Sequence, residues 1–362
     1  MHTHDGTLRR AIGVAMGALL GATAALATDI TWTGGSGDWT NAAKWNPPQV
    51  PTASDHVLLG SGSVTVPPSA TFSNLDWTGG TISGALTVAS NAVLNLGGSS
   101  LKELHGPLTN AGLVRVTGNG QFNLYSGPIE NLVGGVIDFQ ADVTWAGVPA
   151  ATLDNAGTLR KSGGSGTTMI GYPGYPIFVG NSGTIEAGTG TLNLRTGYSN
   201  SPSAVLAISL GGAAPGSGYG RIDFTSPLAL GGTFTASTRN GFRPAPGQRF
   251  LVLSYPLATN AFTCITGMDL GAGLMLQPHF AATSLTLTAA TYRTNTSLPD
   301  LLISRSQNDV VVQWPLGFAG WVLQSTTNLA APVWPPVSGG CGNLAQLPAT
   351  VPWQYFRLHN GN

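Results

Sequence analysis

A turn signal that recurs along the chain is the feature that most restricts its fold. Asn110-Ala-Gly112, Asn155-Ala-Gly157 and Asn181-Ser-Gly183 each precede a short apolar pattern, and Asn131 with Gly134-Gly135 occupies an equivalent place. The steps between asparagines 110, 131, 155 and 181 are 21, 24 and 26 residues. Such steps are typical of one coil of a parallel β-helix, where each turn of the chain stacks on the last. Asn and Gly tolerate the left-handed backbone conformation, which we expect at the corners of these coils.

The segments between the turns alternate in polarity like short strands. Because neighbouring side chains of a strand point to opposite faces, each apolar pair is predicted to face the core and the polar residue between them to face outward. A barrel or sandwich can also use strands this short, but Asn-Gly hairpin turns between paired strands are absent and the turn signals come once per coil. The solenoid is therefore favoured. The clearest strands are Leu86-Thr-Val88, Leu94-Asn-Leu96, Phe122-Asn-Leu124, Ile137-Asp-Phe139 and Leu192-Asn-Leu194.

The composition excludes several classes of protein. Only 8% of the 362 residues are charged, against roughly 25% in an average soluble domain, and solvated helix faces need more Lys and Glu than this chain has. Its 42% hydrophobic residues give a folded core ample material, so disorder is also excluded. Lys+Arg and Asp+Glu balance at 15 each, which gives no electrostatic reason to expect binding to nucleic acid or anionic lipid.

The first 27 residues have the three parts of a secretory signal. Arg9 and Arg10 form the charged segment, residues 11–26 the apolar one, and Ala25-Leu26-Ala27 the small-residue cleavage site. Cleavage is predicted after Ala27. The alternative is that the segment is retained as a membrane anchor, which is disfavoured because the apolar run is short and rich in Gly and Ala. No second apolar stretch reaches the roughly 20 residues that span a bilayer. We therefore expect an exported mature chain without an integral membrane segment.

Three tryptophans surround a glycine-rich turn just after this signal: Trp32, Trp39 and Trp45. An aromatic cluster at this place suits a plug over the open end of a solenoid, whose exposed strand edges need cover. The alternative is a platform for sugar rings, which makes these three residues candidate glycan contacts. The tryptophans at positions 77, 314, 321, 334 and 353 could form such platforms too, but packing is favoured over glycan contact for all of them.

The region from residue 204 to 290 carries motifs that resemble a known group. Pro215-Gly-Ser-Gly-Tyr219, Leu230-Gly-Gly-Thr-Phe234 and Gly247-Gln-Arg-Phe250 follow in this order. They resemble the C-terminal coils of autotransporter-type passenger domains and related secreted bacterial β-helix proteins, and the opening tryptophan run is similar to their N-terminal segment. The resemblance covers most of residues 30–290. It implies a right-handed parallel β-helix at the cell surface, although we see no C-terminal membrane barrel.

A second unit is expected after a Thr/Asn/Ser/Pro linker at residues 294–299. Leu301-Leu-Ile-Ser, Asp309-Val-Val-Val-Gln-Trp314, Trp321-Val-Leu-Gln-Ser-Thr-Thr and Tyr355-Phe-Arg-Leu358 are its strand candidates. This resembles a small β-sandwich-like module at the ends of large exported bacterial proteins, where it implies sorting or surface retention. Cys264 and Cys341 fall on either side of the linker, so we expect two unpaired buried thiols. A bridge across the boundary is the alternative, which an exported compartment permits.

Parallel β-helices also include polysaccharide lyases and hydrolases, which need paired carboxylates or a base beside acidic metal ligands. The best set here is Asp138, Asp142 and Asp154, with Arg160 and Lys161 nearby. Asp138 is expected to point outward and to be accessible. Carboxylates scattered on an outer face usually only solvate it, so no catalytic residue is predicted.

No other constellation of reactive residues is found in the sequence. His56, His105, His279 and His359 have no partner at metal-ligand spacing. Neither a Gly-x-Ser-x-Gly elbow nor a phosphate-binding glycine loop occurs. We therefore predict no catalytic residue, no cofactor and no metal site.

Together these observations predict an all-β chain: residues 1–27 a signal peptide, 28–82 an aromatic-rich cap with the first coils, 83–293 a parallel β-helix, and 294–362 a linker with a β-sandwich-like module. The expected function is a secreted or cell-surface structural or adhesive β-solenoid without catalysis. Its expected partners are extracellular polysaccharide or cell-surface components. A polysaccharide-binding or polysaccharide-degrading protein is the alternative.

Overall fold

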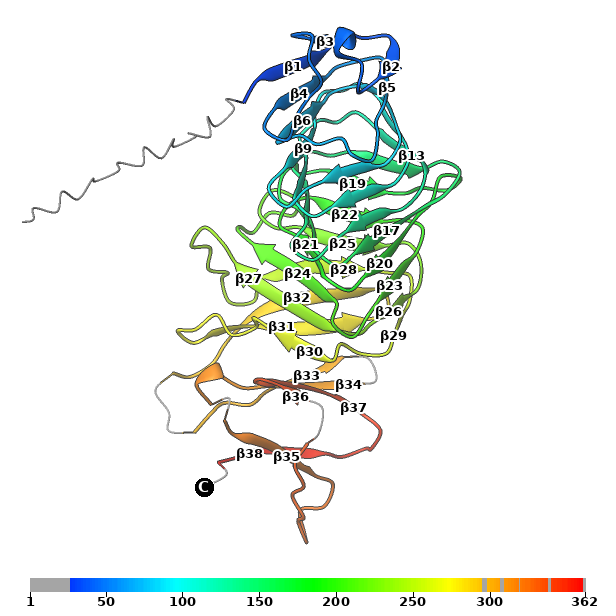
Figure 1. Cartoon of the computed structure of the whole chain (residues 1–362). Coiled ribbons are helices and arrows are strands. Elements are labelled where there is room, and N and C mark those ends of the chain that lie inside the picture. Colours follow the sequence, from blue (N-terminus) through cyan, green and yellow to red (C-terminus); the bar gives the residue numbers. More distant parts are fainter. Residues whose placement is uncertain (1–26, 295–297, 307–308, 319, 338–339, 361–362) are drawn as a thin grey trace, which may run out of the picture.

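The computed structural model describes residues 27–294, 298–306, 309–318, 320–337 and 340–360. The predicted signal peptide lies outside them except for Ala27. Figure 1 shows coils stacked along one axis, with β1 to β3 at one end and β33 to β38 at the other. Among the described residues, none of the helices has the length and apolar character needed to cross a bilayer.

Three sheets run along the stack, and each coil contributes a strand to two or three of them. In spatial order, sheet A contains β3 (Trp45–Asn46), β1 (Asp29–Trp32), β4 (His56–Leu59), β6 (Asn74–Trp77), β9 (Val93–Leu96), β12 (Leu113–Val116), β15 (Val136–Phe139), β18 (Thr158–Lys161), β21 (Thr184–Ala187), β24 (Val205–Leu210), β27 (Thr233–Thr238) and β30 (Cys264–Thr266). Sheet B contains β2 (Ser36–Asp38), β5 (Ser63–Thr65), β7 (Gly80–Ser83), β10 (Lys102–His105), β13 (Phe122–Ser126), β16 (Thr144–Gly147), β19 (Thr167–Ile170), β22 (Thr191–Leu194), β25 (Arg221–Phe224), β28 (Arg249–Ser254), β32 (Ser284–Thr291) and β31 (Leu274–Ala281). Sheet C contains β8 (Leu86–Val88), β11 (Leu108–Asn110), β14 (Ile129–Asn131), β17 (Ala151–Asn155), β20 (Ile177–Asn181) and β23 (Tyr198–Asn200), and β26 (Leu228–Ala229) pairs with β29 (Ala258–Thr259) in a small separate sheet.

Neighbouring strands in the body of the stack run in the same direction, so the prediction of a parallel β-solenoid is confirmed. The stack has about 8 turns, and every pair in sheet C is parallel. Among the described strands of sheets A and B, antiparallel pairing is confined to the two ends: β3 lies on β1, and β32 lies between β28 and β31.

The core is a set of columns in which equivalent residues of successive coils lie above one another. In sheet A the register aligns Leu94, Val114, Ile137, Leu159 and Ile185, and each is fully buried. Burying such a side chain contributes about 1.5–3 kcal/mol. Stability therefore comes from contacts between neighbouring coils, as in other repeat proteins.

The repeated asparagines form a hydrogen-bonded ladder inside the stack. The Nδ2 of Asn110 donates to Oδ1 of Asn131 at 2.7 Å, Asn131 to Asn155 at 2.6 Å, and Asn155 to Asn181 at 2.7 Å. The second Nδ2 hydrogen of Asn155 binds the carbonyl of Thr184 at 3.0 Å. Each asparagine ends a strand of sheet C and directs its amide inward, where the next coil provides the partner.

The prediction that these turns need left-handed backbone was wrong for most of them. None of the four asparagines has a positive φ, nor do Gly112, Gly157 and Gly183, although Gly134 does at 86°. Close approach explains the glycines instead. A Cβ on Gly157 or Gly183 would lie 2.2 Å from a carbonyl oxygen of the preceding coil, a distance that excludes any side chain.

We expect Asn155→Ala to destabilise the solenoid by about 3 kcal/mol. The substitution removes three hydrogen bonds inside the core: the one that Asn131 Nδ2 donates to Asn155, and the two that Asn155 Nδ2 donates to Asn181 and to the carbonyl of Thr184. A buried polar group that loses its partner costs about 1–3 kcal/mol. Urea unfolding monitored by circular dichroism measures the loss. Asn91→Ala, which removes an exposed asparagine of a turn, is the control and should change stability by less than about 0.5 kcal/mol.

The three N-terminal tryptophans, here called the tryptophan cap, pack against one another in the first part of the stack. Trp45 lies 4.9 Å from Trp32 and 5.0 Å from Trp39 between ring centroids, edge to face in both cases. All three are at most 4% exposed. Trp45 Nε1 donates to the carbonyl of Trp39 at 2.8 Å, and the short helix η1 (Ala42–Lys44) leads into β3.

The C-terminal unit consists of two small antiparallel sheets. One contains β33 (Leu302–Ser306), β34 (Asp309–Gln313), β37 (Leu344–Pro348) and β36 (Gly340–Cys341), and the other β35 (Val322–Thr326) and β38 (Tyr355–His359), with the short helix η2 (Leu316–Phe318) between β34 and β35. The four predicted strands are present, whereas β36 and β37 were not predicted.

The expectation of two free thiols was wrong, because Cys264 and Cys341 form a disulfide across 77 residues. Cys264 begins β30, the last strand of sheet A, and Cys341 ends β36 of the C-terminal unit. This unit is docked on the last coil, which brings the two cysteines together. Gln313 Nε2 also donates to the carbonyl of Leu276 at 3.0 Å inside the contact, and Val311 belongs to the same core as the solenoid.

Candidate functional site

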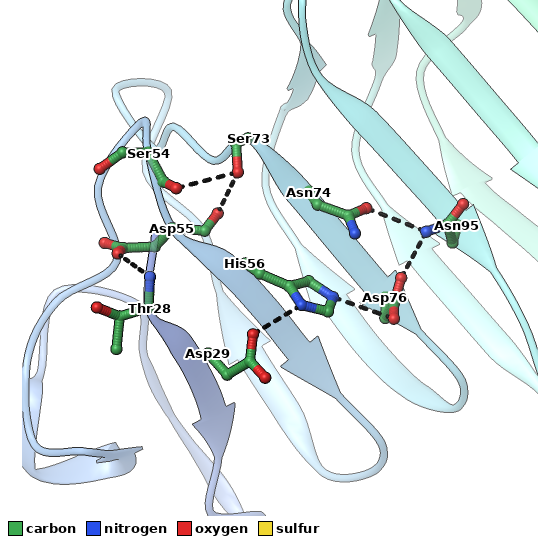
Figure 2. A network of polar contacts seen from close by, with 9 residues as sticks. All are labelled: Thr28, Asp29, Ser54, Asp55, His56, Ser73, Asn74, Asp76 and Asn95. Atoms are coloured by element: carbon green, nitrogen blue, oxygen red, sulfur yellow. Dashed lines mark hydrogen bonds and ion pairs between the residues drawn. The ribbon is translucent and has the colours of Figure 1, made fainter. Parts of the chain in front are cut away.

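A polar network joins the first strands of sheet A on their outer face (Figure 2). The ring of His56 lies between two carboxylates: Nδ1 is 2.9 Å from Oδ1 of Asp29, and Nε2 is 3.1 Å from Oδ2 of Asp76. The Nε2 contact lacks the alignment of a hydrogen bond. Asn95 Nδ2 donates to Asp76 and, at 3.0 Å, to Oδ1 of Asn74. The sequence interpretation of His56 as a lone residue missed these contacts, which come from neighbouring coils.

This network does not have the arrangement of a nucleophilic site. Both ring nitrogens of His56 face carboxylates, whereas a general base needs one nitrogen directed at the group that it activates. The hydroxyl of Ser73, in the same network, donates to the carbonyls of Ser54 and Asp55 at 3.2 and 2.9 Å. The network instead connects β1, β4, β6 and β9 and holds the first coils together.

Asp138 points outward as predicted, but it is not accessible. Only 1% of the residue is exposed, because the neighbouring strand places Arg160 over it with Nη2 2.9 Å from Oδ2. Ser162 donates to Oδ1 at 2.6 Å and Gln140 to Oδ2 at 3.0 Å. Burial acts to raise the pKa of Asp138, but these hydrogen bonds outweigh it and the pKa is lowered.

The lowered pKa makes the contribution of Asp138 depend on pH. An unfolded Asp has a pKa of about 3.9; the contribution is fully present above that value and is lost as the pH falls through the lower pKa of the folded state. We expect Asp138→Asn to lower the free energy of unfolding by about 1.5 kcal/mol at pH 7. This value is the lower end of the range for hydrogen bonds to a charged group, and we choose it because Arg160 is partly exposed. The difference between variant and wild type in urea unfolding should shrink from pH 5 to pH 3. A constant difference would contradict this assignment.

The remaining members of the carboxylate set do not form one centre. Lys161 points into the core, fully buried, and its Nζ binds Oδ1 of Asp142 at 2.6 Å, the carbonyls of Ala141 and Gly163, and the hydroxyl of Thr168. Asp154 lies on β17 in sheet C. A catalytic group that includes Asp138, Asp142 and Asp154 therefore finds no support in this geometry.

A surface groove lies along the outer face of sheet C. It has a volume of about 620 Å3 and crosses β14, β17, β20 and β23 at the ends of these strands. Its walls are three of the ladder asparagines, the residues on either side of each, and the equivalent residues at the end of β23. They are Glu130, Asn131, Leu132, Asp154, Asn155, Ala156, Gly180, Asn181, Ser182, Ser199, Asn200 and Ser201.

Two exposed carboxylates stand next to each other in this groove. The register pairs Glu130 with Asp154 on adjacent coils, about 4.8 Å apart in the hydrogen-bonding direction. Neither has an ion-pair partner among the described residues, and no Lys, Arg or His lines the groove. These are the most accessible neighbouring acids of sheet C, and the sequence interpretation included only Asp154.

The residue beside Asp154 in this column is a glycine, which leaves room for the carboxylate. The same outward column continues from Asp154 to Gly180 and Ser199. A Cβ on Gly180 would lie 2.9 Å from Oδ1 of Asp154, so the carboxylate occupies part of the space that a side chain would fill. Two residues earlier on the same face of β20, Phe178 is 48% exposed. Its ring lies over Gly197, where a Cβ would be 2.7 Å from Cδ1.

The other predicted residues lie elsewhere. The tryptophans of the cap are buried, so in this arrangement their faces are not offered to a sugar. His105 stacks on Tyr125 with ring centroids 4.2 Å apart, and burial lowers the pKa of His279. In the C-terminal unit Trp314 is buried, whereas Trp353 is 74% exposed. No group of three or more potential metal ligands is found in the described part of the chain.

Comparison with known proteins found no match to any protein-family model and none to a curated protein. The β-solenoid is the fold that the resemblance to autotransporter-type passengers implies, while membership of that group stays a prediction. The functional conclusion therefore rests on the fold and on the polar contacts across its outer face.

Proposed function

We propose that this protein is an exported, non-catalytic β-solenoid that serves as an adhesive or structural scaffold at the cell surface or in the extracellular matrix. One observation carries the proposal: charged groups on the outer face of sheet A bind one another across coils. Asp138 with Arg160 and His56 with Asp29 are examples. Side chains that bind one another in this way stiffen the solenoid and are not available to react with a substrate.

Two further features support export. The sequence of the first 27 residues fits a cleaved signal, and the chain contains a disulfide between Cys264 and Cys341. Disulfides persist in oxidising compartments and are rare in the cytosol. The small unit that this disulfide fixes to the last coil fits a role in sorting or retention.

Fractionation of cells that produce the full chain tests this proposal. The mature chain is expected in the extracellular or surface fraction, beginning at Thr28 by N-terminal sequencing. A version without residues 2–27 is the control and should stay in the cytosol. Recovery of the uncleaved full chain from the cytosol would overturn the proposal.

A polysaccharide-degrading enzyme is the second candidate, because Glu130 and Asp154 stand on adjacent coils in one groove. Retaining glycosidases place two carboxyl groups about 5–5.5 Å apart, near the coil spacing. However, the general acid of such enzymes usually lies in an apolar pocket that keeps it protonated. Both carboxylates here are exposed, which favours binding over cleavage.

A further inference from the structure

We propose that the sheet C groove binds a polysaccharide that carries free amino groups. This inference rests on the proposed extracellular role and names the ligand class for one surface of the scaffold. It depends on the charge of the groove, on its repeat along the stack, and on the aromatic ring at its side.

The charge of the groove selects against acidic ligands. Glu130 and Asp154 are direct neighbours across two coils, and like charges in this relation destabilise a sheet. On the outer face of sheet A, by contrast, Asp138 faces Arg160. An ammonium group between the two carboxylates would relieve their repulsion and form charge-assisted hydrogen bonds.

The groove repeats with the coils. It spans β14 to β23, which are three intervals of about 4.8 Å. Beyond the carboxylates, the hydroxyls of Ser182, Ser199 and Ser201 lie along its length. A groove that offers polar groups at regular intervals suits a polymer whose sugar units repeat hydroxyl and amino groups along one direction.

An apolar surface lies beside the groove. Phe178 lies on the same face as Gly180, about 6.6 Å away along the strand, and remains half-exposed. The absence of a side chain at position 197 lets its ring lie against the next coil. The carbon-bound hydrogens of a sugar ring can pack on such a face while its polar groups reach the carboxylates.

Binding of a chitosan hexamer to the full mature chain, measured by isothermal titration calorimetry at low salt, tests the inference. The fully N-acetylated hexamer, which lacks amines, and a galacturonate hexamer, which is acidic, are the comparison ligands. Spermine has amines but no sugar rings. We expect the chitosan hexamer to bind at least tenfold more tightly than each of the other three, and its affinity to fall as salt increases.

Three variants locate the site. The double variant Glu130→Gln, Asp154→Asn removes both charges and should lower the affinity for chitosan at least tenfold. Gly180→Thr should lower it by as much, because the new side chain fills the groove. Thr is chosen because it suits an outward position on a strand. Asp38→Asn, which removes an exposed carboxylate from β2, is the control and should bind normally. Melting temperatures at or above the wild-type value in the variants show that a loss of binding does not come from unfolding.

Equal binding of the acetylated hexamer or of spermine would overturn the ligand class. Unchanged affinity in the Gly180→Thr variant would overturn the location, and absence of binding by the wild type would overturn both. These outcomes do not touch the proposed function, which depends on where the mature chain is found in the fractionation experiment.

Discussion

Ile137→Asp is expected to remove about 4 kcal/mol or more from the stability of the solenoid. Ile137 is fully buried between Val114 and Leu159 on the adjacent coils. A carboxylate at this place has no partner in the column, and an uncompensated buried charge is among the few changes that cost this much. Because each coil depends on its neighbours, the loss should spread along sheet A.

Thermal unfolding and urea unfolding followed by circular dichroism measure this loss. Val136→Asp is the matched control, since it puts the same charge on the outward face of the same strand. It should cost less than half as much as the inward substitution. Leu194→Asp tests the corresponding inward position of sheet B, where 1% of the residue is exposed. Wild-type stability in either inward variant would contradict the assignment of the core face.

Cys341→Ser is expected to release the C-terminal unit from the last coil. The disulfide closes a loop of 77 residues, for which chain-entropy models give a stabilisation of about 4 kcal/mol. The contact that remains includes the hydrogen bond from Gln313 to Leu276 and the packing of Val311. We expect the unit to open far more often in the variant, while the coils before β30 keep their stability.

Limited proteolysis measures the opening of the C-terminal unit. Cleavage after residue 290 should be much faster in the Cys341→Ser variant, and the surviving fragment should contain the tryptophan cap. Cys264→Ser removes the same bond from the other side and should behave alike. Equal cleavage rates in wild type and both variants would show that the disulfide does not hold the unit in place.

Alternation and repeat length were sufficient to predict the solenoid. The apolar pairs of Ile137-Asp-Phe139 and Leu94-Asn-Leu96 fill the core, because period two fixes the face of each side chain. The repeated asparagines also marked the coils correctly. The spacing did not indicate that each asparagine is buried and hydrogen-bonded to the next. That prediction needs the register between coils.

The groove could have been found from the same repeat. Aligning the chain on the ladder asparagines places the residue before each of them in one column: Thr109, Glu130, Asp154 and Gly180. Two adjacent acids and a gap follow directly from that alignment. The sequence interpretation grouped acids by closeness along the chain instead, which joined Asp138 to Asp154 although they lie in different sheets.

Other contacts depend on partners that are far apart along the chain. Arg160 covers Asp138 from 22 residues away, and His56 meets Asp29 from 27 residues away. Cys264 and Cys341 come together only because the C-terminal unit docks on the last coil. A linker between two units suggested separation, whereas the apolar contact around Val311 joins them.

End-group analysis of a polysaccharide incubated with the protein is the most direct test of a scaffold that holds its ligand without cleaving it. Chitosan and neutral glucans are incubated for days with the wild-type chain, and new reducing ends are counted against a sample without protein. We predict no increase for any polymer, including those that bind. A rise in reducing ends that disappears in the Asp154→Asn variant would contradict the scaffold and identify the sheet C groove as an active site.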